Sequence, residues 1–150
     1  MLMMTWGRRD GDAINPTLYP NYTVMQDRLE EGYIDYRDNV SLSTSAEIYI
    51  APVGLAFKHV HDSITASGGN PLSPTSTFYG LYDTDGSHPS TSGSYLAACV
   101  LFAALTGDSP VGLTDNTTMD ATLRLTLQQA AAEVVFLSLI HISEPTRHRR

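Results

Sequence analysis

The chain has 150 residues, of which 42% are hydrophobic and 17% are charged, and its formal net charge is −7. The length suits one domain, the composition excludes a disordered chain, and the acidic balance offers no basic face for nucleic acid. No apolar run reaches the roughly 18 to 20 residues that a membrane-spanning helix needs. The single cysteine, Cys99, excludes an internal disulfide, and we expect it to be a buried, inert thiol.

The chain opens with an apolar run over residues 1–5, which ends at Trp6 and a stretch rich in glycine and aspartate. A continuous apolar run of this kind predicts the end of a buried strand in a parallel sheet. Because a domain starting inside a buried strand would be unusual, we expect part of the domain upstream to be missing. For Trp6 we favour a packing role over a place on the rim of an active site.

A helix is predicted next, from Thr23 to about Asn39. Thr23 would cap this helix, and Gln26, three residues later, would complete a capping box. Its apolar stripe is expected to consist of four residues at helical spacing, which are Met25, Leu29, Tyr33 and Tyr36.

The run EIYIAP at residues 47–52 predicts a second buried strand, and a helix is expected from Leu55 to about Thr65. The order strand, helix, strand, helix implies parallel pairing, so the expected fold class is α/β with a parallel sheet. His59 and His61 fall in the second helix, where side chains two residues apart diverge. We therefore favour surface or packing roles for these histidines.

Two further helices are predicted in the second half of the chain. The first spans residues 90–106, with Ser90 or Thr91 as its cap and Gly107 as its stop. Its apolar face is expected to consist of Tyr95, Leu96, Cys99, Val100, Ala103 and Ala104. The second spans about residues 119–136, where leucines, alanines and a valine recur at helical spacing.

The last fourteen residues, 137–150, read LSLIHISEPTRHRR and differ in character from the rest. They lack a clear amphipathic pattern, and they are basic where the preceding chain is acidic. Eleven consecutive residues, LSLIHISEPTR, resemble the in-frame translation of a common sequencing-library adapter. We therefore expect residues 1–136 to form the domain and residues 137–150 to be a non-native tail, rather than a basic tail that binds an acidic partner.

The most informative segment is YDTDGSHPS, in which Asp85 and His88 stand three residues apart with Gly86 between them. A turn at Gly86 would place the carboxylate beside one nitrogen of the imidazole. The other nitrogen can then act as general base for a hydroxyl nucleophile. An ordinary turn is an alternative, because Asp, Gly, Ser and Pro are common turn residues. A second alternative is a metal site made of Asp85, His88 and either His59 or His61.

Four blocks in this order resemble one branch of the SGNH/GDSL serine hydrolases. They are MTWG at residues 4–7, YTVMQDRL at 22–29, APVG at 51–54, and the segment 85–98, which begins DGSHPS and ends GSYLAA. The resemblance covers about residues 3–136 and implies a three-layer (flavodoxin-like) parallel sheet, incomplete at the N-terminus. It also implies hydrolysis of an ester, such as an acyl group on a small molecule, a lipid or a carbohydrate, through an acyl-enzyme and without metal or organic cofactor.

Carried over by position, the resemblance makes His88 the general base and Asp85 its orienting carboxylate. The family's Gly-Asp/Asn-Ser block has no counterpart upstream of Trp6. The later Gly-Asp-Ser at residues 107–109 follows the His88 block, so we reject Ser109 as the nucleophile. Because loss of the nucleophile costs many orders of magnitude in rate, we expect this chain not to be competent alone. The alternatives are a non-catalytic carbohydrate-binding or interaction domain on the same scaffold, and a metal-dependent hydrolase.

Overall fold

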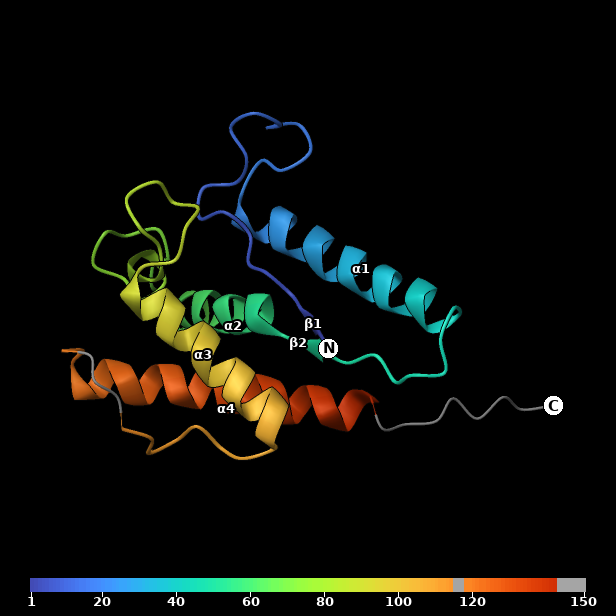
Figure 1. Ribbon diagram of the computed structural model, residues 1–150. Helices are drawn as coiled ribbons and strands as arrows, with labels where there is room; N and C mark the ends of the chain where they lie inside the picture. Colours follow the sequence, from blue (N-terminus) through green and yellow to red (C-terminus); the bar gives the residue numbers. More distant parts are fainter. Residues whose placement is uncertain (115–117, 143–150) are drawn as a thin grey trace.

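A computed structural model gives the positions of residues 1–114 and 118–142, and of residues 137–142 it gives the backbone alone. This part of the chain is mostly helical (Figure 1). The α-helices are α1 (Tyr22–Ser41), α2 (Val53–Ala66), α3 (Thr91–Thr106) and α4 (Ala121–Ile142). The other elements are the strands β1 (Leu2–Met3) and β2 (Ile50–Ala51) and the 3₁₀-helix η1 (Tyr79–Leu81).

The expected three-layer, flavodoxin-like sheet is wrong for this chain. The sheet of the described residues has two strands of two residues each, paired in parallel with Leu2 opposite Ile50 and Met3 opposite Ala51. Because α1 separates the strands in sequence, the chain can return to the same end of the sheet and pair in parallel, as expected. However, Met3 is 43% exposed and Tyr49 is 45% exposed, so the two apolar runs are not covered as strands of a layered sheet would be.

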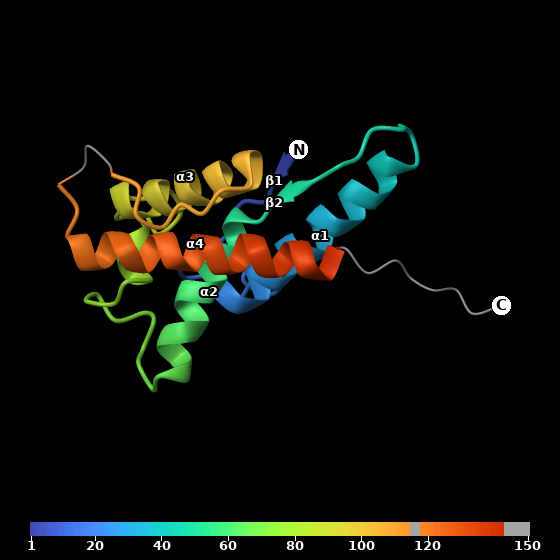
Figure 2. The same cartoon turned by 90° about the horizontal axis from the view of Figure 1, so that it is seen from below.

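The core lies among α2, α3, α4 and η1. Figure 2 shows α4 crossing in front of α2 with α3 alongside, and all three helices are in mutual contact. Each large apolar side chain that leaves water there stabilises the fold by roughly 1.5–3 kcal/mol. The apolar faces predicted for α3 and α4 supply buried residues to this core, namely Leu96, Cys99, Val100, Ala103, Leu127, Ala130 and Ala131.

α1 lies to one side of this core and contacts mainly α2 (Figure 1). Its buried residues are Tyr22 and Gln26, whereas Tyr36 of the predicted stripe is 59% exposed. The predicted cap at Thr23 is also wrong. Asn21 caps the helix, because its extended backbone lets its side chain accept a hydrogen bond, at 3.0 Å, from the third amide of the helix.

Both ends of α3 are confirmed as predicted. Ser90 caps the helix, since its hydroxyl oxygen accepts hydrogen bonds from the amides of Ser92 at 3.1 Å and Gly93 at 3.3 Å. Gly107 ends the helix with φ at +75°, a left-handed conformation that glycine adopts without strain. The Ser90 cap matters for the site, because it anchors the loop that enters α3.

α4 continues to Ile142, past the predicted domain boundary after residue 136. The assignment of residues 137–150 to a non-native tail stays a prediction, and residues 143–150 lie outside the described part of the chain. None of the helices in the described residues is long and apolar enough to cross a membrane.

Candidate functional site

The loop between η1 and α3 closes on itself at the surface of the core. Tyr82 and Pro89 form an antiparallel bridge at its base, and the amide of Asp83 donates a hydrogen bond to the carbonyl of His88 at 2.8 Å. At the tip, the amide of Gly86 donates to the carbonyl of Asp83 at 3.0 Å. Gly86 has φ at +66°, a left-handed conformation that side chains disfavour and that lets the chain reverse here.

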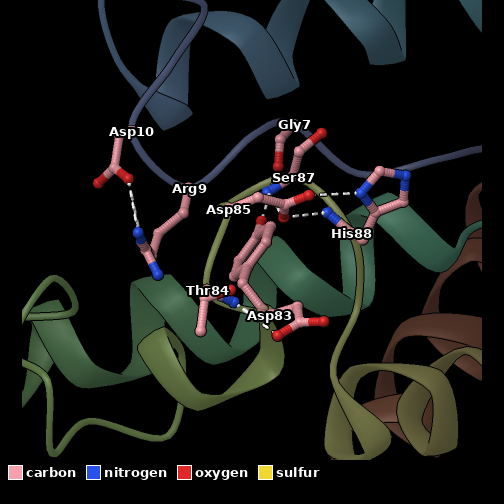
Figure 3. Close-up of polar contacts among 9 residues, drawn as sticks. Gly7, Arg9, Asp10, Asp83, Thr84, Asp85, Ser87 and His88 are labelled. Carbon is pink, nitrogen blue, oxygen red and sulfur yellow. Dashed lines mark hydrogen bonds and ion pairs between the residues drawn. The ribbon is translucent and has the colours of Figure 1, made fainter.

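The structure brings Asp85 and His88 together across this tip (Figure 3). His88 Nδ1 lies 2.5 Å from Asp85 Oδ2. The other carboxylate oxygen, Oδ1, accepts hydrogen bonds from the backbone amides of Ser87 at 2.8 Å and of His88 at 2.9 Å. The carboxylate is therefore fixed by the loop backbone and faces the Nδ1 edge of the ring.

The opposite nitrogen of the ring is accessible. The His88 side chain is 79% exposed, and its Nε2 makes no hydrogen bond with any residue that the structure describes. A neutral imidazole whose proton lies on Nδ1, toward the carboxylate, has its lone pair on Nε2. The Asp85–His88 pair can therefore accept a proton from a group that approaches from solvent.

The contact shifts the pKa of both partners. Hydrogen bonds from the His88 ring, and then from the amides of Ser87 and His88, hold the pKa of the Asp85 carboxyl well below its usual range. The hydrogen bond and charge of Asp85 raise the pKa of His88, with a smaller contribution from Asp83 that Arg8 opposes. A base with a raised pKa binds protons more strongly, and it is available once the pH exceeds that pKa.

The segment that follows β1 supports the loop from the other side. Three hydrogen bonds join the two segments: Trp6 Nε1 to the Ser87 carbonyl at 3.0 Å, the Arg9 amide to the Gly86 carbonyl at 2.8 Å, and the Tyr82 hydroxyl to the Gly7 carbonyl at 2.6 Å. Because these partners are far apart in sequence, the bonds tie the candidate site to the end of the sheet.

Trp6 and Tyr82 are also part of the packing beneath the loop. Trp6 stacks on Phe57 of α2, with ring centroids 4.9 Å apart and planes 12° apart. Tyr82 meets the same phenylalanine edge to face at 5.6 Å, and burial raises the pKa of the Tyr82 hydroxyl well above its usual range. The expected packing role of Trp6 agrees with this contact, whereas its hydrogen bond to the loop has no local signal in the sequence.

Arg9 is a second residue that sequence reasoning missed. Its side chain is buried, its guanidinium lies 3.9 Å from the ring centroid of Tyr79, and it pairs with Asp10 at 2.8 Å. The hydrogen bond to Asp10 raises the pKa of Arg9, so the guanidinium stays charged. A buried arginine held in this way gives the loop a rigid neighbour beside Gly86.

The two histidines of α2, His59 and His61, pair with carboxylates away from the site. His59 Nε2 is 3.2 Å from a carboxylate oxygen of Glu133, which links α2 to α4, and His61 pairs with the carboxylate of the next residue at 2.7 Å. Across the part of the chain that the structure describes, no group of three or more histidine, cysteine, aspartate or glutamate side chains is arranged to hold a metal ion. The metal-dependent alternative therefore gains no support from these residues.

The rejected Gly-Asp-Ser sequence lies at the opposite end of α3 from His88. His88 stands just before the N-terminus of this helix, and Gly107 caps its C-terminus. The sixteen residues of α3 separate the two by about 24 Å, at 1.5 Å of rise per residue. The Ser109 hydroxyl cannot exchange a proton with His88 over that distance.

Comparison of the chain with family models, with curated proteins and with solved structures finds no match. The geometry of the Asp85–His88 pair and the short blocks that resemble SGNH/GDSL hydrolases are the features that point to a function.

Proposed function

We propose that this chain carries the acid–base half of a serine ester hydrolase, with His88 as general base and Asp85 as its orienting carboxylate. The observation that carries the proposal is the 2.5 Å contact between His88 Nδ1 and Asp85 Oδ2, with Nε2 left exposed. In Ser–His–Asp hydrolases the carboxylate fixes the imidazole in this way, while the opposite nitrogen takes the hydroxyl proton. The blocks MTWG, APVG and DGSHPS support the same assignment by resemblance.

The reaction would proceed in two transfers of the acyl group. Nε2 of His88 takes the proton of a hydroxyl, the oxygen attacks the ester carbonyl, and the leaving alcohol receives the proton back. Water then repeats the sequence on the acylated hydroxyl. The substrate class is an ester of a small molecule, a lipid or a carbohydrate, and the chemistry needs no metal or organic cofactor.

The nucleophilic hydroxyl is the part that the described residues do not supply. Within them, no serine or threonine hydroxyl makes a hydrogen bond with Nε2 of His88, and Ser109 lies about 24 Å away along α3. We therefore expect this chain alone to hydrolyse short-chain p-nitrophenyl esters no faster than equimolar free imidazole does.

An added alcohol can take the place of that hydroxyl and test the proposal. With p-nitrophenyl acetate and trifluoroethanol, Nε2 would take the alcohol proton, the alcohol oxygen would attack the acetyl carbonyl, and p-nitrophenolate would leave. We expect trifluoroethyl acetate to form faster than with equimolar free imidazole, and faster as the pH rises through the pKa of His88. His88→Gln should remove this excess rate.

Two matched variants of the same loop test whether Asp85 orients His88 as a base or whether His88 acts only as an exposed histidine. In Asp85→Asn, the side-chain oxygen can still accept the backbone amides, but the NH₂ group would face Nδ1 and shift the ring proton to Nε2. That variant should lose at least about tenfold in rate. Asp83→Asn removes a carboxylate that does not touch the ring and should keep most of the rate. Equal rates for both variants, or a rate that ignores His88→Gln, would contradict the proposal.

The openness of the site favours a second candidate, a non-catalytic carbohydrate-binding or interaction module on the same scaffold. Its motivating observation is that the His88 side chain is 79% exposed rather than enclosed in a substrate cleft. This candidate predicts that an acetylated oligosaccharide shifts the NMR resonances of the Asp85–His88 loop, while acetyl transfer to the added alcohol shows no dependence on His88.

A further inference from the structure

We infer that Trp6 is a positioning residue for His88, because its indole N–H fixes the peptide group from which the His88 ring extends. The inference takes the role of His88 from the proposed function, but its test needs no ester. It concerns how an exposed imidazole is kept in one place. With a side chain 79% exposed, His88 is oriented by its own backbone and by Asp85 rather than by surrounding side chains.

The position of the indole is determined by the core. Trp6 follows β1, and its ring lies nearly parallel to that of Phe57, which is fully buried in α2. The centroids are 4.9 Å apart, a distance typical of favourable stacking between aromatic rings. The direction of the N–H bond is therefore set by packing with α2, independently of the loop that receives it.

The acceptor of this N–H is the critical feature. Trp6 Nε1 donates to the Ser87 carbonyl at 3.0 Å, and the amide of the same peptide group, that of His88, donates to Asp85 Oδ1 at 2.9 Å. Because a peptide group is planar and rigid, these two bonds hold it at both edges. Trp6 and Asp85 thus clamp one plane, and the imidazole that Asp85 orients is attached to it.

Loss of the indole N–H should therefore change the position of the His88 imidazole relative to Asp85. With only one edge of the Ser87–His88 peptide group held, the loop can move away from the Asp85 carboxylate, and the contact at Nδ1 weakens. The groups that act electrostatically on His88 are Asp85 and Asp83 from its own loop and Arg8 from the segment after β1. None of them is altered by a substitution at Trp6, so a change in the titration of His88 would report the position of the ring.

The chain contains a single tryptophan, which makes this coupling directly observable by NMR. One indole N–H resonance is expected, and it should shift with pH at the same midpoint as the His88 imidazole. His88→Gln should abolish that shift, which separates His88 from the other histidines. Asp83→Asn should leave the indole and imidazole midpoints equal to each other.

Two replacements at position 6 test the direction of the effect. Trp6→Phe keeps an aromatic ring on Phe57 without the N–H, and benzothienylalanine keeps the bicyclic shape with sulfur in its place, in case the phenylalanine variant does not fold. Each should lower the His88 midpoint toward its ordinary value. Gly107→Ala is the control, because it weakens the fold at the far end of α3 and leaves the Trp6–Phe57 stack and the indole N–H in place.

The inference is supported if both position 6 replacements lower the His88 midpoint more than Gly107→Ala does. Circular dichroism measures the loss of stability in each variant. An indole resonance that does not follow the titration of His88, or an equal fall of the midpoint in Gly107→Ala, would overturn the inference. Because no substrate is present, these outcomes are independent of the acetyl-transfer assay. If the indole and the His88 imidazole titrate together but acetyl transfer does not depend on His88, Trp6 remains a positioning residue and the hydrolase proposal is rejected.

Discussion

Gly86→Ala probes the turn that brings Asp85 to His88. Gly86 has φ at +66°, and a Cβ added there would lie 3.0 Å from Arg9 Nη2 and 3.0 Å from Asp10 Oδ2. The alanine would therefore be strained in its backbone and crowded at its side chain. Either relief, a change of φ or a shift of the loop, would move the carboxylate relative to the ring.

The size of the effect follows from these two terms. A left-handed backbone costs an L-residue about 1–2 kcal/mol, and alanine recovers roughly 0.4–1 kcal/mol by restricting the unfolded chain. Crowding adds to the cost, because Arg9 is buried, although Asp10 is 61% exposed and can yield. We expect Gly86→Ala to lower the free energy of unfolding by about 1–2 kcal/mol and to lower the pKa of His88.

Urea unfolding followed by the fluorescence of Trp6 measures the stability, and NMR titration measures the pKa. Gly107→Ala is the matched control, since φ is +75° there but nothing lies within 4 Å of the added Cβ. It should cost about 1 kcal/mol and leave the pKa of His88 unchanged. A Gly86→Ala variant as stable as the wild type, or an equal fall of the His88 pKa in Gly107→Ala, would contradict the role assigned to the Gly86 turn.

Three further outcomes are expected. Tyr82→Phe removes the hydroxyl that donates a buried hydrogen bond to the Gly7 carbonyl at 2.6 Å. Urea unfolding should show a fall of about 1–3 kcal/mol in the free energy of unfolding, and an unchanged value would argue against that bond. Gln128→Leu should lower the free energy of unfolding by about 1–3 kcal/mol, measured by thermal melting. The reason is that the side-chain amide of the buried Gln128 makes hydrogen bonds with the Tyr95 hydroxyl of α3 and with the backbone of residues 112 and 113 in the loop before α4. The contact between Asp85 and His88 stabilises the fold through both partners. The contribution of Asp85 is complete above the ordinary aspartate pKa of 3.8 and is lost as the pH falls through the lowered pKa of Asp85. The contribution of His88 is complete below the ordinary histidine pKa of 6.5 and is lost as the pH rises through the raised pKa of His88. The stability difference between wild type and Asp85→Asn should therefore be greatest between pH 3.8 and 6.5 and decline on either side, and a difference independent of pH would contradict the pairing.

The helices could be predicted because their signals are local. Helical spacing of apolar residues located α3 and α4, and Ser90 and Gly107 marked the ends of α3. The sheet could not be predicted from such signals. How far a strand extends depends on partner strands and covering helices elsewhere in the chain, and here the pairing stops after two residues in each apolar run. A resemblance in short blocks therefore led to the prediction of a layered sheet, which the described residues do not form.

The candidate site divides in the same way. The contact between Asp85 and His88 was readable because three residues and a glycine turn suffice to form it. The residues that support the loop could not be predicted, since Trp6 and its acceptor Ser87 are 81 positions apart in sequence. Gln26 was missed for another reason: it was assigned to a cap, whereas its side chain is buried and accepts a hydrogen bond from the amide of Gly7 at 2.8 Å.

The position of the proton on the neutral His88 ring tests the central claim most directly. Long-range ¹H–¹⁵N correlation above the pKa of His88 distinguishes the two tautomers. If Asp85 orients the ring for base catalysis, the proton lies on Nδ1 in the wild type, and it moves to Nε2 in Asp85→Asn. A wild-type ring that carries its proton on Nε2 would contradict the claim, because its lone pair would then lie on Nδ1, toward Asp85, and the exposed nitrogen could not accept the proton of a hydroxyl.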